Sequence, residues 1–427
     1  MSVLVLGAAV SGAASVRLLE STGADVVVYD ADPERASAVA AGRHRAAAGE
    51  WDPSVLDGVD LVVASPGIPP HAPPIADALA AGVTVWSEIE LGARHLDCPL
   101  VAVTGTNGKT TVTELAAEIL RHSGIEAAAV GNIGDALSDA VGGGHDVLVV
   151  ETAALQLHFI DAFHAGAAVL LNIAPDHLDW FGGSFAAYRA AKMRVFENQT
   201  ADDVVVFDAD DDEAPSAVAA ARSRPVPVSG TRRPPGGSGP EGDRLWIADV
   251  AVDLGSMVRS DPVFLVDAAA AGVAALHVGA TPDGVRSALA AFRPSAHRRE
   301  LVTEAGGIAW IDDSKATNPH AALAAIGSYP SVVLIAGGRN KDLDLSALGK
   351  HPNVRHLIGI GESGPEIVEA AGFGEVAGDM ATAVAAAARA ARPGDTVLLS
   401  PGCASFDMFR SYAHRGEVFA ALVREVG

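Results

Sequence analysis

The sequence is poor in cysteine and in positive charge, and each shortage excludes a class of protein. Two cysteines among 427 residues, Cys98 and Cys403, cannot build a disulfide scaffold, and they suit a reducing cytoplasm. Aspartate and glutamate number 53 against 30 lysines and arginines, which gives a net charge of −23. Such a charge repels nucleic-acid backbones and anionic membranes, so we expect a cytoplasmic protein that has no nucleic-acid partner.

Long apolar runs are also missing, and aromatic residues make up only 5% of the chain. No run approaches the ~20 residues of a membrane-spanning helix, so no membrane span is expected. The apolar start, residues 2–7, is too short for a signal peptide and lacks its basic flank. Alanine and small aliphatic residues must fill the interior, as in an α/β protein with close helix contacts. At ~150 residues per domain this length predicts about three domains, and we expect the protein to be a monomer.

The most informative stretch runs from Val101 to Val112, where a short apolar strand is followed by a glycine-containing loop and a helix-forming run. This order predicts a phosphate-binding loop, because glycines let backbone N–H groups turn toward a polyphosphate and the helix N-terminus adds its positive dipole. Lys109 would reach the β- and γ-phosphates of ATP, and the Thr110 hydroxyl would coordinate Mg²⁺. Val103 stands where the full G-x-x-x-x-G-K-[ST] pattern has its first glycine, so a plain turn before a helix is the alternative. The predicted ATP-binding residues here are Gly105, Thr106, Asn107, Gly108, Lys109, Thr110 and Thr111.

Residues 2–30 predict a strand–helix–strand unit of the dinucleotide-binding type. The turn Gly7–Gly12 follows the first strand, and Asp30 ends the second strand, where a ribose acceptor is expected. Ala9 replaces the middle glycine of G-x-G-x-x-G, which hinders close approach of a pyrophosphate. An NAD-dependent oxidoreductase is therefore an alternative, but it leaves the loop at Lys109 unexplained. The turn Ser65–Gly67 follows another predicted strand, and ligands of open α/β sheets bind at such strand ends.

Three polar residues after the phosphate-binding loop are further candidates. Glu151 ends an apolar strand, where a carboxylate orients Mg²⁺ or its water in nucleotide hydrolases, and a buried acid without a cation is costly. His177 lies between two aspartates in residues 175–179, which indicates either a capped turn or a metal site. Lys192 lies in a predicted helix, and by itself it would be interpreted as a surface lysine.

These motifs occur in one order that resembles a known family. The residues are Thr104–Thr110, Gly131–Gly134, Glu151, Pro175–Asp179 and Tyr188–Lys192, and the match continues through Asp313–Asn318, Thr396–Ser405 and Tyr412–Gly416. The chain resembles the Mur ligases, the ATP-dependent amino-acid ligases of peptidoglycan synthesis, over essentially its whole length. The stretch Asp313-Ser-Lys-Ala-Thr-Asn318 is similar to that of the members that add D-glutamate.

The resemblance implies an α/β fold of three domains. A Rossmann-like N-terminal domain over residues 1–96 would bind a UDP-sugar. A central domain of the P-loop ATPase type, which binds a mononucleotide, would span residues 97–292 and hold ATP and two Mg²⁺ ions. A Rossmann-like C-terminal domain over residues 293–427 would bind the amino acid. The implied reaction is ATP-dependent ligation of D-glutamate to UDP-N-acetylmuramoyl-L-alanine through an acyl phosphate, a cytoplasmic step of peptidoglycan synthesis.

The resemblance also implies the roles of individual residues. Lys109, Lys192 and His177 would be catalytic, and Lys192 would be carbamylated, which converts a cation into an anionic metal ligand. The implied metal ligands are Thr110, Glu151, His177 and Lys192. From the third domain, Arg298 and Asp313 would orient ATP. The implied UDP-substrate residues are Val10, Ser11, Asp30, Ser65, Gly67 and Asn132, and the implied D-glutamate residues are Lys315, Thr317, Lys341, Ser405 and Tyr412.

Two departures from the family pattern leave alternatives open. The family's acid is usually followed by Ser-Ser-aromatic-Gln, and here Glu151 is followed by Thr-Ala-Ala-Leu-Gln156. Asp267 stands where an asparagine that contacts ATP is expected. The alternatives are a diverged ligase that adds L-glutamate or another amino acid, and a binding protein that hydrolyses ATP without ligation. Folate polyglutamation is a weaker alternative, because it does not explain the first domain.

Overall fold

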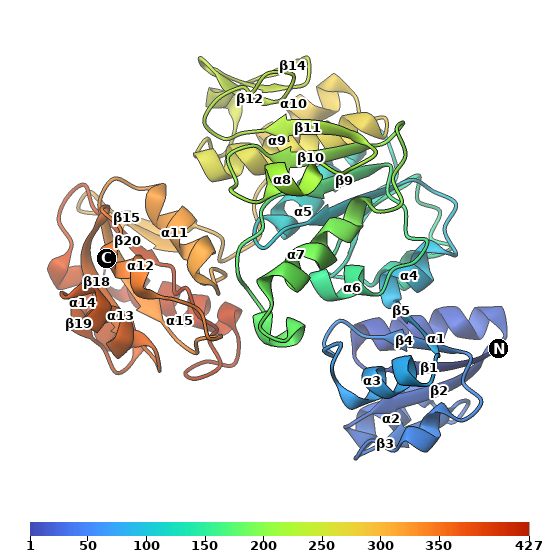
Figure 1. Ribbon diagram of the computed structural model, residues 1–427. Helices are drawn as coiled ribbons and strands as arrows, with labels where there is room; N and C mark the ends of the chain where they lie inside the picture. Colours follow the sequence, from blue (N-terminus) through green and yellow to red (C-terminus); the bar gives the residue numbers. More distant parts are fainter. Residues whose placement is uncertain (427) are drawn as a thin grey trace. The chain divides into compact units, whose positions relative to one another are not determined.

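The computed structural model describes residues 1–426 and divides into two compact units (Figure 1). The first comprises residues 1–173 and 177–292, and the second comprises residues 174–176 together with the chain from 293 onward. The predicted α/β class is confirmed, because each unit is built on largely parallel sheets with helices packed against them. Within the described residues, no helix is long and apolar enough to cross a membrane.

The first sheet has five parallel strands in the order β3-β2-β1-β4-β5. Its strands are β1 (Ser2–Leu6), β2 (Asp25–Asp30), β3 (Arg45–Ala48), β4 (Leu61–Ala64) and β5 (Thr84–Ser87), and its helices are α1 (Val10–Thr22), α2 (Pro33–Ala40), η1 (Pro53–Leu56) and α3 (Pro73–Ala80). Alternate residues of β1 enter separate cores on the two faces, Val3 and Val5 on one and Leu4 and Leu6 on the other. The chain crosses from β1 to β2 on one side and later returns to β4 on the other. Such a reversal of strand order is where open α/β sheets bind ligands.

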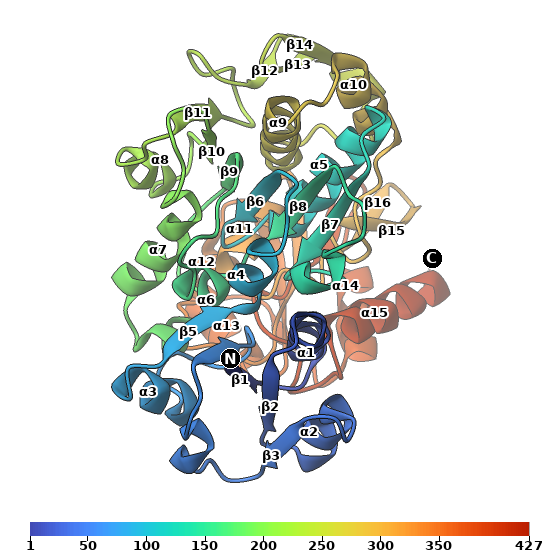
Figure 2. The same cartoon turned by 90° about the vertical axis from the view of Figure 1, so that its right-hand side faces the viewer.

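The second sheet has six parallel strands in the order β11-β10-β9-β6-β8-β7. They are β6 (Leu100–Thr104), β7 (Ala127–Gly131), β8 (Val147–Glu151), β9 (Ala167–Leu170), β10 (Val204–Asp208) and β11 (Arg224–Val228). Helices α5 (Lys109–His122), α9 (Pro262–His277) and α10 (Pro282–Ala291) share one apolar core with this sheet. The core of the other face includes α6 (Ala154–His158), α7 (Phe185–Met193) and α8 (Ala214–Val218), and η2 (Leu137–Ala140), η3 (Leu178–Phe181) and η4 (Arg194–Phe196) lie in the connections. Figure 2 shows α5 and α9 running side by side along this sheet.

A small antiparallel sheet packs on α9. It consists of β12 (Gly239–Glu241), β13 (Arg244–Ile247) and β14 (Val250–Asp253), and η5 (Leu254–Ser256) follows it. Gly272 of α9 allows the close contact, because a Cβ there would lie 2.6 Å from Cγ2 of Ile247. Between the first two sheets lies α4 (Glu88–Ala93), which begins directly where β5 ends.

The second unit carries the third sheet, in the order β15-β16-β20-β17-β18-β19. Its strands are β15 (Glu300–Ala305), β16 (Ile308–Asp312), β17 (Val332–Gly337), β18 (Val354–Ile360), β19 (Glu375–Val376) and β20 (Thr396–Leu399). Only the β15–β16 pair is antiparallel. Two apolar cores cover its faces, and the helices are α11 (Pro319–Gly327), α12 (Ser346–Lys350), α13 (Gly364–Ala371), α14 (Met380–Ala390) and α15 (Tyr412–Val426).

Candidate active site

The carboxyl ends of three neighbouring strands of the second sheet, β6, β8 and β7, carry predicted nucleotide-binding residues. β6 ends at Thr104, directly before the phosphate-binding loop. β8, which pairs with β6, ends at Glu151, and β7 beyond it leads into Asn132. Because parallel strands end at the same edge of a sheet, these residues from distant parts of the chain lie together.

The loop between β6 and α5 is held open by its own backbone geometry. Gly108 has a φ of +84°, in the left-handed region, and it is the N-cap of α5. The ammonium of Lys109 donates to the carbonyl oxygens of Gly105 at 2.9 Å and of Thr106 at 3.1 Å. Asn172, which follows β9, clamps the loop because its Oδ1 accepts the backbone N–H of Asn107 at 2.8 Å and its Nδ2 donates to that residue's carbonyl at 3.2 Å. Asn172 is a loop residue that the sequence motifs did not identify.

Glu151 is the best-formed candidate metal ligand. Its side chain is buried, with 3% of the residue exposed. The Thr110 hydroxyl donates to its Oε2 at 2.8 Å, and Nδ2 of Asn132 donates to its Oε1 at 3.1 Å. Both of these partners are neutral, and a buried carboxylate gains most from a cation. Hydroxyl and carboxylate oxygens are the donors that Mg²⁺ prefers, so Thr110 and Glu151 fit this metal. Asn132, predicted to contact the UDP-substrate, lies at this end of the sheet.

Lys192 lies on the other side of the same loop. The simple interpretation of Lys192 as a surface lysine is wrong, because the residue is 2% exposed. Its Nζ donates to the carbonyl of Gly105 at 2.7 Å and lies 4.8 Å from the ring centre of Tyr188. The Tyr188 hydroxyl in turn lies 3.1 Å from Oγ1 of Thr106. The structure therefore brings Lys192, Tyr188 and the phosphate-binding loop together.

His177 directly precedes η3 with a φ of +50°, and its ring centre lies 5.0 Å from that of Trp180. Among the described residues, His297, Glu300 and Asp312 of the second unit form a cluster whose ligand atoms all lie within 4.8 Å of one another, and His177 is not part of it. His177 is therefore placed on a tight turn, and its role as a metal ligand stays a prediction.

Asp267 of α9 approaches the phosphate-binding loop closely. It is 6% exposed, and a Cβ built on Gly108 would lie 2.7 Å from its Oδ1. The expected neutral amide is thus replaced by an acid beside the loop. Its negative charge opposes a polyphosphate unless a cation or proton compensates for it.

The candidate UDP-substrate residues lie at the carboxyl ends of β1 and β4. Val10 is 63% exposed at the start of α1, beside Ser11, and Gly67 is exposed in the turn after β4. The Ser65 hydroxyl lies 3.4 Å from the carbonyl of Gly7, so the two turns touch. Asp30 lies inside this arrangement: its Oδ2 accepts the N–H of Ala8 at 2.7 Å and its Oδ1 accepts the N–H of Asp32 at 2.9 Å.

Within the second unit, predicted residues gather at the carboxyl ends of β16 and β20. Lys315 and Tyr412 form a cation–π pair, with Nζ 3.8 Å from the ring centre. Asp313 is buried, and its carboxylate accepts the Ser400 hydroxyl at 2.8 Å and the Arg299 N–H at 3.2 Å. Burial raises the pKa of Asp313 to about 6, against the opposing effect of the Arg299 charge. Both oxygens of this carboxylate thus accept hydrogen bonds, one from the Arg299 N–H and one from the Ser400 hydroxyl.

Other predicted residues of this unit are more dispersed. Nζ of Lys341 lies 3.1 Å from Oδ1 of Asp176, whose Oδ2 accepts Nδ2 of Asn318 at 3.2 Å. Ser405 is buried at 3% exposure in the loop after β20, and Thr317 and Arg298 are half-buried.

Arg415 belongs to the Tyr412–Gly416 motif of the resemblance, but the sequence analysis assigned it no role. Its guanidinium is 1% exposed and holds two loops together, donating to Oγ and the carbonyl of Ser314 at 2.9 and 2.8 Å and to the Cys403 carbonyl at 3.1 Å. Burial lowers the pKa of Arg415 to about 10. Because Ser314 precedes Lys315 and Cys403 lies two residues before Ser405, Arg415 fixes the loops that carry both side chains.

Comparison with known proteins places these features in one family. Three family profiles match: "Mur ligase MurD-like, N-terminal domain" over residues 1–87, "Mur ligase middle domain" over 103–232 and "Mur ligase, glutamate ligase domain" over 297–403. The UDP-N-acetylmuramoylalanine–D-glutamate ligase of Frankia casuarinae is 42% identical, over 99% of this chain and 94% of its own. The enzyme of the same name from Streptomyces coelicolor is 40% identical, over 100% of this chain and 98% of its own.

Solved structures agree on the fold. A pseudomurein peptide ligase type C from Methanothermus fervidus superposes with a TM-score of 0.63 at 18% identity, covering 100% of both chains. UDP-N-acetylmuramate–alanine ligase from Thermotoga maritima gives a TM-score of 0.57 at 16% identity, also over 100% of both chains. The expectation of an α/β fold with three domains of this type is confirmed.

Proposed function

This chain belongs to the Mur ligase family, and we propose that it ligates D-glutamate to UDP-N-acetylmuramoyl-L-alanine at the expense of ATP. The relatives that are about 40% identical over nearly the whole chain carry the name of that reaction, which supports the proposal. In this proposal residues 1–96 bind the UDP-sugar, residues 97–292 bind ATP and Mg²⁺, and residues 293–427 bind the amino acid.

The observation that carries the proposal is the loop between β6 and α5 with its partners. Lys109, Thr110 and Glu151 are held at one sheet edge, and a divalent cation there would neutralise phosphate charge and polarise the γ-phosphoryl group. The ammonium of Lys109 is held within the loop by two carbonyls, and it would turn to the phosphates when they bind. Catalysis then consists mainly of positioning and charge neutralisation.

The proposed reaction has two steps. An oxygen of the alanyl carboxylate attacks the γ-phosphorus and ADP leaves, which gives an acyl phosphate. The D-glutamate amine attacks the acyl carbon, phosphate leaves, and the amine loses a proton as the amide forms. Exclusion of water from the site protects the acyl phosphate from hydrolysis.

We further propose that Lys192 becomes carbamylated and, with His177 and Glu151, serves a second Mg²⁺. The burial of Lys192 beside the phosphate-binding loop supports this proposal, because burial disfavours the charged form of a lysine and carbamylation requires the uncharged amine. For this, the uncharged Nζ that now donates to Gly105 would form a bond to the carbon of CO₂ and lose a proton, which gives an anionic carbamate. The cation–π contact of Lys315 with Tyr412 supports a role in D-glutamate binding, because it brings two of the predicted D-glutamate residues together.

The decisive experiment measures phosphate release from ATP and Mg²⁺ in the presence of UDP-N-acetylmuramoyl-L-alanine. Parallel reactions contain D-glutamate, L-glutamate or no amino acid, and mass spectrometry identifies the product. We expect release and a product one glutamyl residue heavier only with D-glutamate. A product formed with L-glutamate alone would contradict the proposed specificity and favour the diverged ligase. Phosphate release that does not depend on the amino acid would contradict ligation and favour a protein that only hydrolyses ATP.

A further inference from the structure

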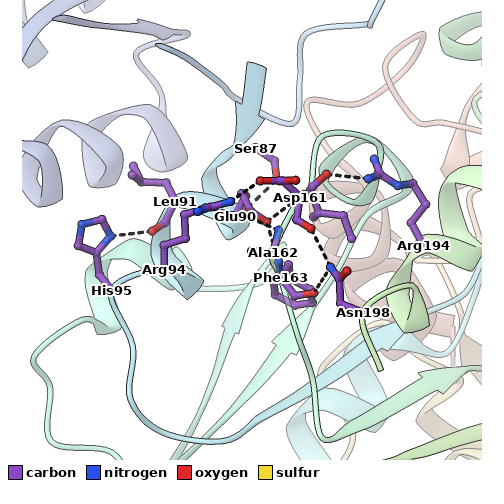
Figure 3. Close-up of polar contacts among 11 residues, drawn as sticks. Ser87, Glu90, Leu91, Arg94, His95, Asp161, Ala162, Phe163, Arg194 and Asn198 are labelled. Atoms are coloured by element: carbon purple, nitrogen blue, oxygen red, sulfur yellow. Dashed lines mark hydrogen bonds and ion pairs between the residues drawn. The ribbon is translucent and has the colours of Figure 1, made fainter. Parts of the chain in front are cut away.

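Glu90 of α4 is a carboxylate that the proposed mechanism does not use, yet it has a complete set of partners (Figure 3). Its side chain is 0% exposed. Its Oε2 accepts the N–H groups of Asp161 at 2.9 Å and Phe163 at 2.8 Å, and its Oε1 accepts the N–H of Ala162 at 2.9 Å. Nε of Arg94 also donates a hydrogen bond to Oε1 of Glu90, at 2.6 Å. Three consecutive backbone donors thus converge on one anion.

A carboxylate is the only side chain that satisfies this set. Three N–H groups and a guanidinium need an acceptor on both oxygens, and the amide of glutamine offers one acceptor and turns a donor toward the others. Hydrogen bonds to an ionised group are stronger than neutral ones, so the conformation of residues 158–163 depends on the Glu90 charge.

The same segment is held from its opposite side by the end of α7. Arg194 donates to the carbonyl of His158 and, at 2.7 Å, to that of Ile160. Nδ2 of Asn198 donates to the carbonyls of Asp161 at 2.9 Å and Phe163 at 3.0 Å. Arg194 follows Met193 at the end of α7, two residues beyond Lys192.

The segment also reaches the first sheet. The N–H of Ser87, the last residue of β5, donates to the Phe159 carbonyl at 2.9 Å. Hydrogen bonds and the backbone between them therefore connect the β5–α4 junction, through residues 158–163 and Arg194, to the end of the helix that carries Lys192.

We propose that Glu90 is a positioning residue, which fixes Lys192 relative to the domain of the first sheet through residues 158–163 and Arg194. The inference rests on the proposed function, in which that domain holds the UDP-substrate and Lys192 serves the site of phosphoryl transfer. Loss of the Glu90 charge leaves the phosphate-binding loop intact, because Asn172 and Thr104–Gly108 form it without Glu90. It loosens the alignment of Lys192 instead.

The chain offers a matched control two residues away. Glu88 lies on the same helix, is 1% exposed, and its Oε1 accepts the Ser138 N–H at 2.6 Å rather than the backbone of residues 158–163. Glu88→Gln therefore makes the same glutamate-to-glutamine replacement at a comparably buried position outside the path, although burial raises the pKa of Glu88 to about 7 and less charge is lost there.

The experiment compares Glu90→Gln, Glu88→Gln, Arg194→Lys and the double variant Glu90→Gln/Arg194→Lys in the full-length protein. We expect Glu90→Gln to lower kcat about 10- to 100-fold while the KM values for ATP and D-glutamate stay within about threefold, which is the sign of lost positioning. Glu88→Gln stays within about twofold of the wild type. The double variant is no slower than the slower single variant, because both changes break one path.

Amide hydrogen exchange provides a readout that does not depend on activity. Glu90→Gln should speed exchange in residues 158–163 and also in residues 187–196, and Glu88→Gln in neither. Faster exchange confined to residues 158–163, wild-type kcat, or multiplicative effects in the double variant would overturn the proposal. If Glu90→Gln does not fold, Arg194→Lys decides the question by the same readouts. A wild-type protein that forms no product with D-glutamate would instead count against the proposed function alone, since the exchange pattern would remain.

Discussion

The loop after β1 and the loop after β6 share one architecture and differ in chemistry. Each joins a buried parallel strand to a helix at a point where strand order reverses. In the first loop an acid from the next strand, Asp30, accepts the N–H of Ala8. In the second loop an amide, Asn172, holds the backbone, and the carboxylate of the acid Glu151 accepts hydrogen bonds from the neutral side chains of Thr110 and Asn132.

The difference concerns where negative charge is placed. A carboxylate that occupies loop N–H groups leaves fewer donors for a phosphate, so the first loop suits a nucleotide's sugar or base better than its triphosphate. The acid beside the second loop, Glu151, also lies on a neighbouring strand, but its carboxylate accepts the Thr110 hydroxyl instead of a loop N–H, and the loop adds the ammonium of Lys109. Strand–glycine loop–helix is therefore a shared scaffold, and the position of the acid decides what it can bind.

The largest effect is expected from a substitution that impairs the second loop and leaves the first loop unchanged. Lys109→Ala removes the cation that would balance the γ-phosphate, and we expect kcat to fall about 10²- to 10³-fold. The KM for the UDP-substrate should change less than threefold, because the first loop is untouched. Steady-state kinetics measure both values, and Lys350→Ala, at an exposed lysine of α12, is the control with wild-type rates. A comparable fall in both variants would show that total charge, not this site, matters.

The second prediction compares the glycines of the two loops. Gly108→Ala forces a Cβ to 2.7 Å from Oδ1 of Asp267 and 2.8 Å from Cδ1 of Leu171 at a φ of +84°, so we expect the KM for ATP to rise about tenfold. In Gly12→Ala the Cβ would lie 1.8 Å from the carbonyl oxygen of Gly7, which is backbone and cannot rotate away.

Gly12→Ala should therefore lower the thermal unfolding midpoint more than Gly108→Ala and leave the KM for ATP unchanged. Gly378→Ala, where an added Cβ meets nothing within 4 Å, serves as the control for both. If Gly12→Ala and Gly108→Ala act alike on the KM for ATP, the two loops are not independent.

Much of this comparison was present in the sequence, because its signals are local. The strands, the glycine loops and the strand-end acid Glu151 follow from runs of fewer than about ten residues, and the domain order followed from the resemblance. Adjacent parallel strands then bring their ends together without further information.

The remaining features depend on tertiary packing. Taken by itself, Lys192 would be interpreted as a surface lysine, because helix periodicity does not say which face meets the loop after β6, and only the resemblance gave it a role. The structure shows that it is buried beside this loop. Arg415 was one basic residue in a terminal helix until packing placed its guanidinium between two loops. The role of Asp30 toward the UDP-substrate stays a prediction, and its contact with Ala8 depends on loop curvature that residue spacing does not specify.

A third prediction sharpens the assignment of the first loop. Asp30→Asn leaves one acceptor oxygen for two N–H groups, those of Ala8 and Asp32, so the loop should loosen. We expect the KM for the UDP-substrate to rise about tenfold, equivalent to about 1.4 kcal/mol, while the KM for ATP is unchanged. The control is Asp32→Asn, which changes the cap of α2, where Asp32 accepts the N–H groups of Glu34 and Arg35 and forms an ion pair with Arg35. A change in the KM for ATP would contradict the separation of the two loops.

The smallest effect on catalysis is expected in the helix that joins the two domains, where the change affects stability instead. Burial raises the pKa of Glu88 from 4.5 to about 7, against the opposing effect of the Ser138 hydrogen bond, and its Oε2 has no hydrogen-bond partner among the described residues. The folded protein therefore holds a proton that the unfolded chain releases between these pH values, so this group makes stability fall as pH rises from about 4.5 to about 7. At roughly 1.4 kcal/mol per pKa unit, the cost above pH 7 is about 3 to 4 kcal/mol.

Glu88→Gln keeps the shape and removes the titration. We expect the variant to unfold a few degrees higher than the wild type at pH 8 and at nearly the same temperature at pH 5, while its catalytic rates stay within about twofold. Thermal unfolding followed across this pH range measures the difference. If the unfolding temperatures of the two proteins changed with pH in parallel, the Glu88 carboxyl would keep an ordinary pKa. The helix that joins the two domains would then tolerate a buried charge. In the first loop, by contrast, the Asp30 carboxylate is stabilised by hydrogen bonds from backbone N–H groups.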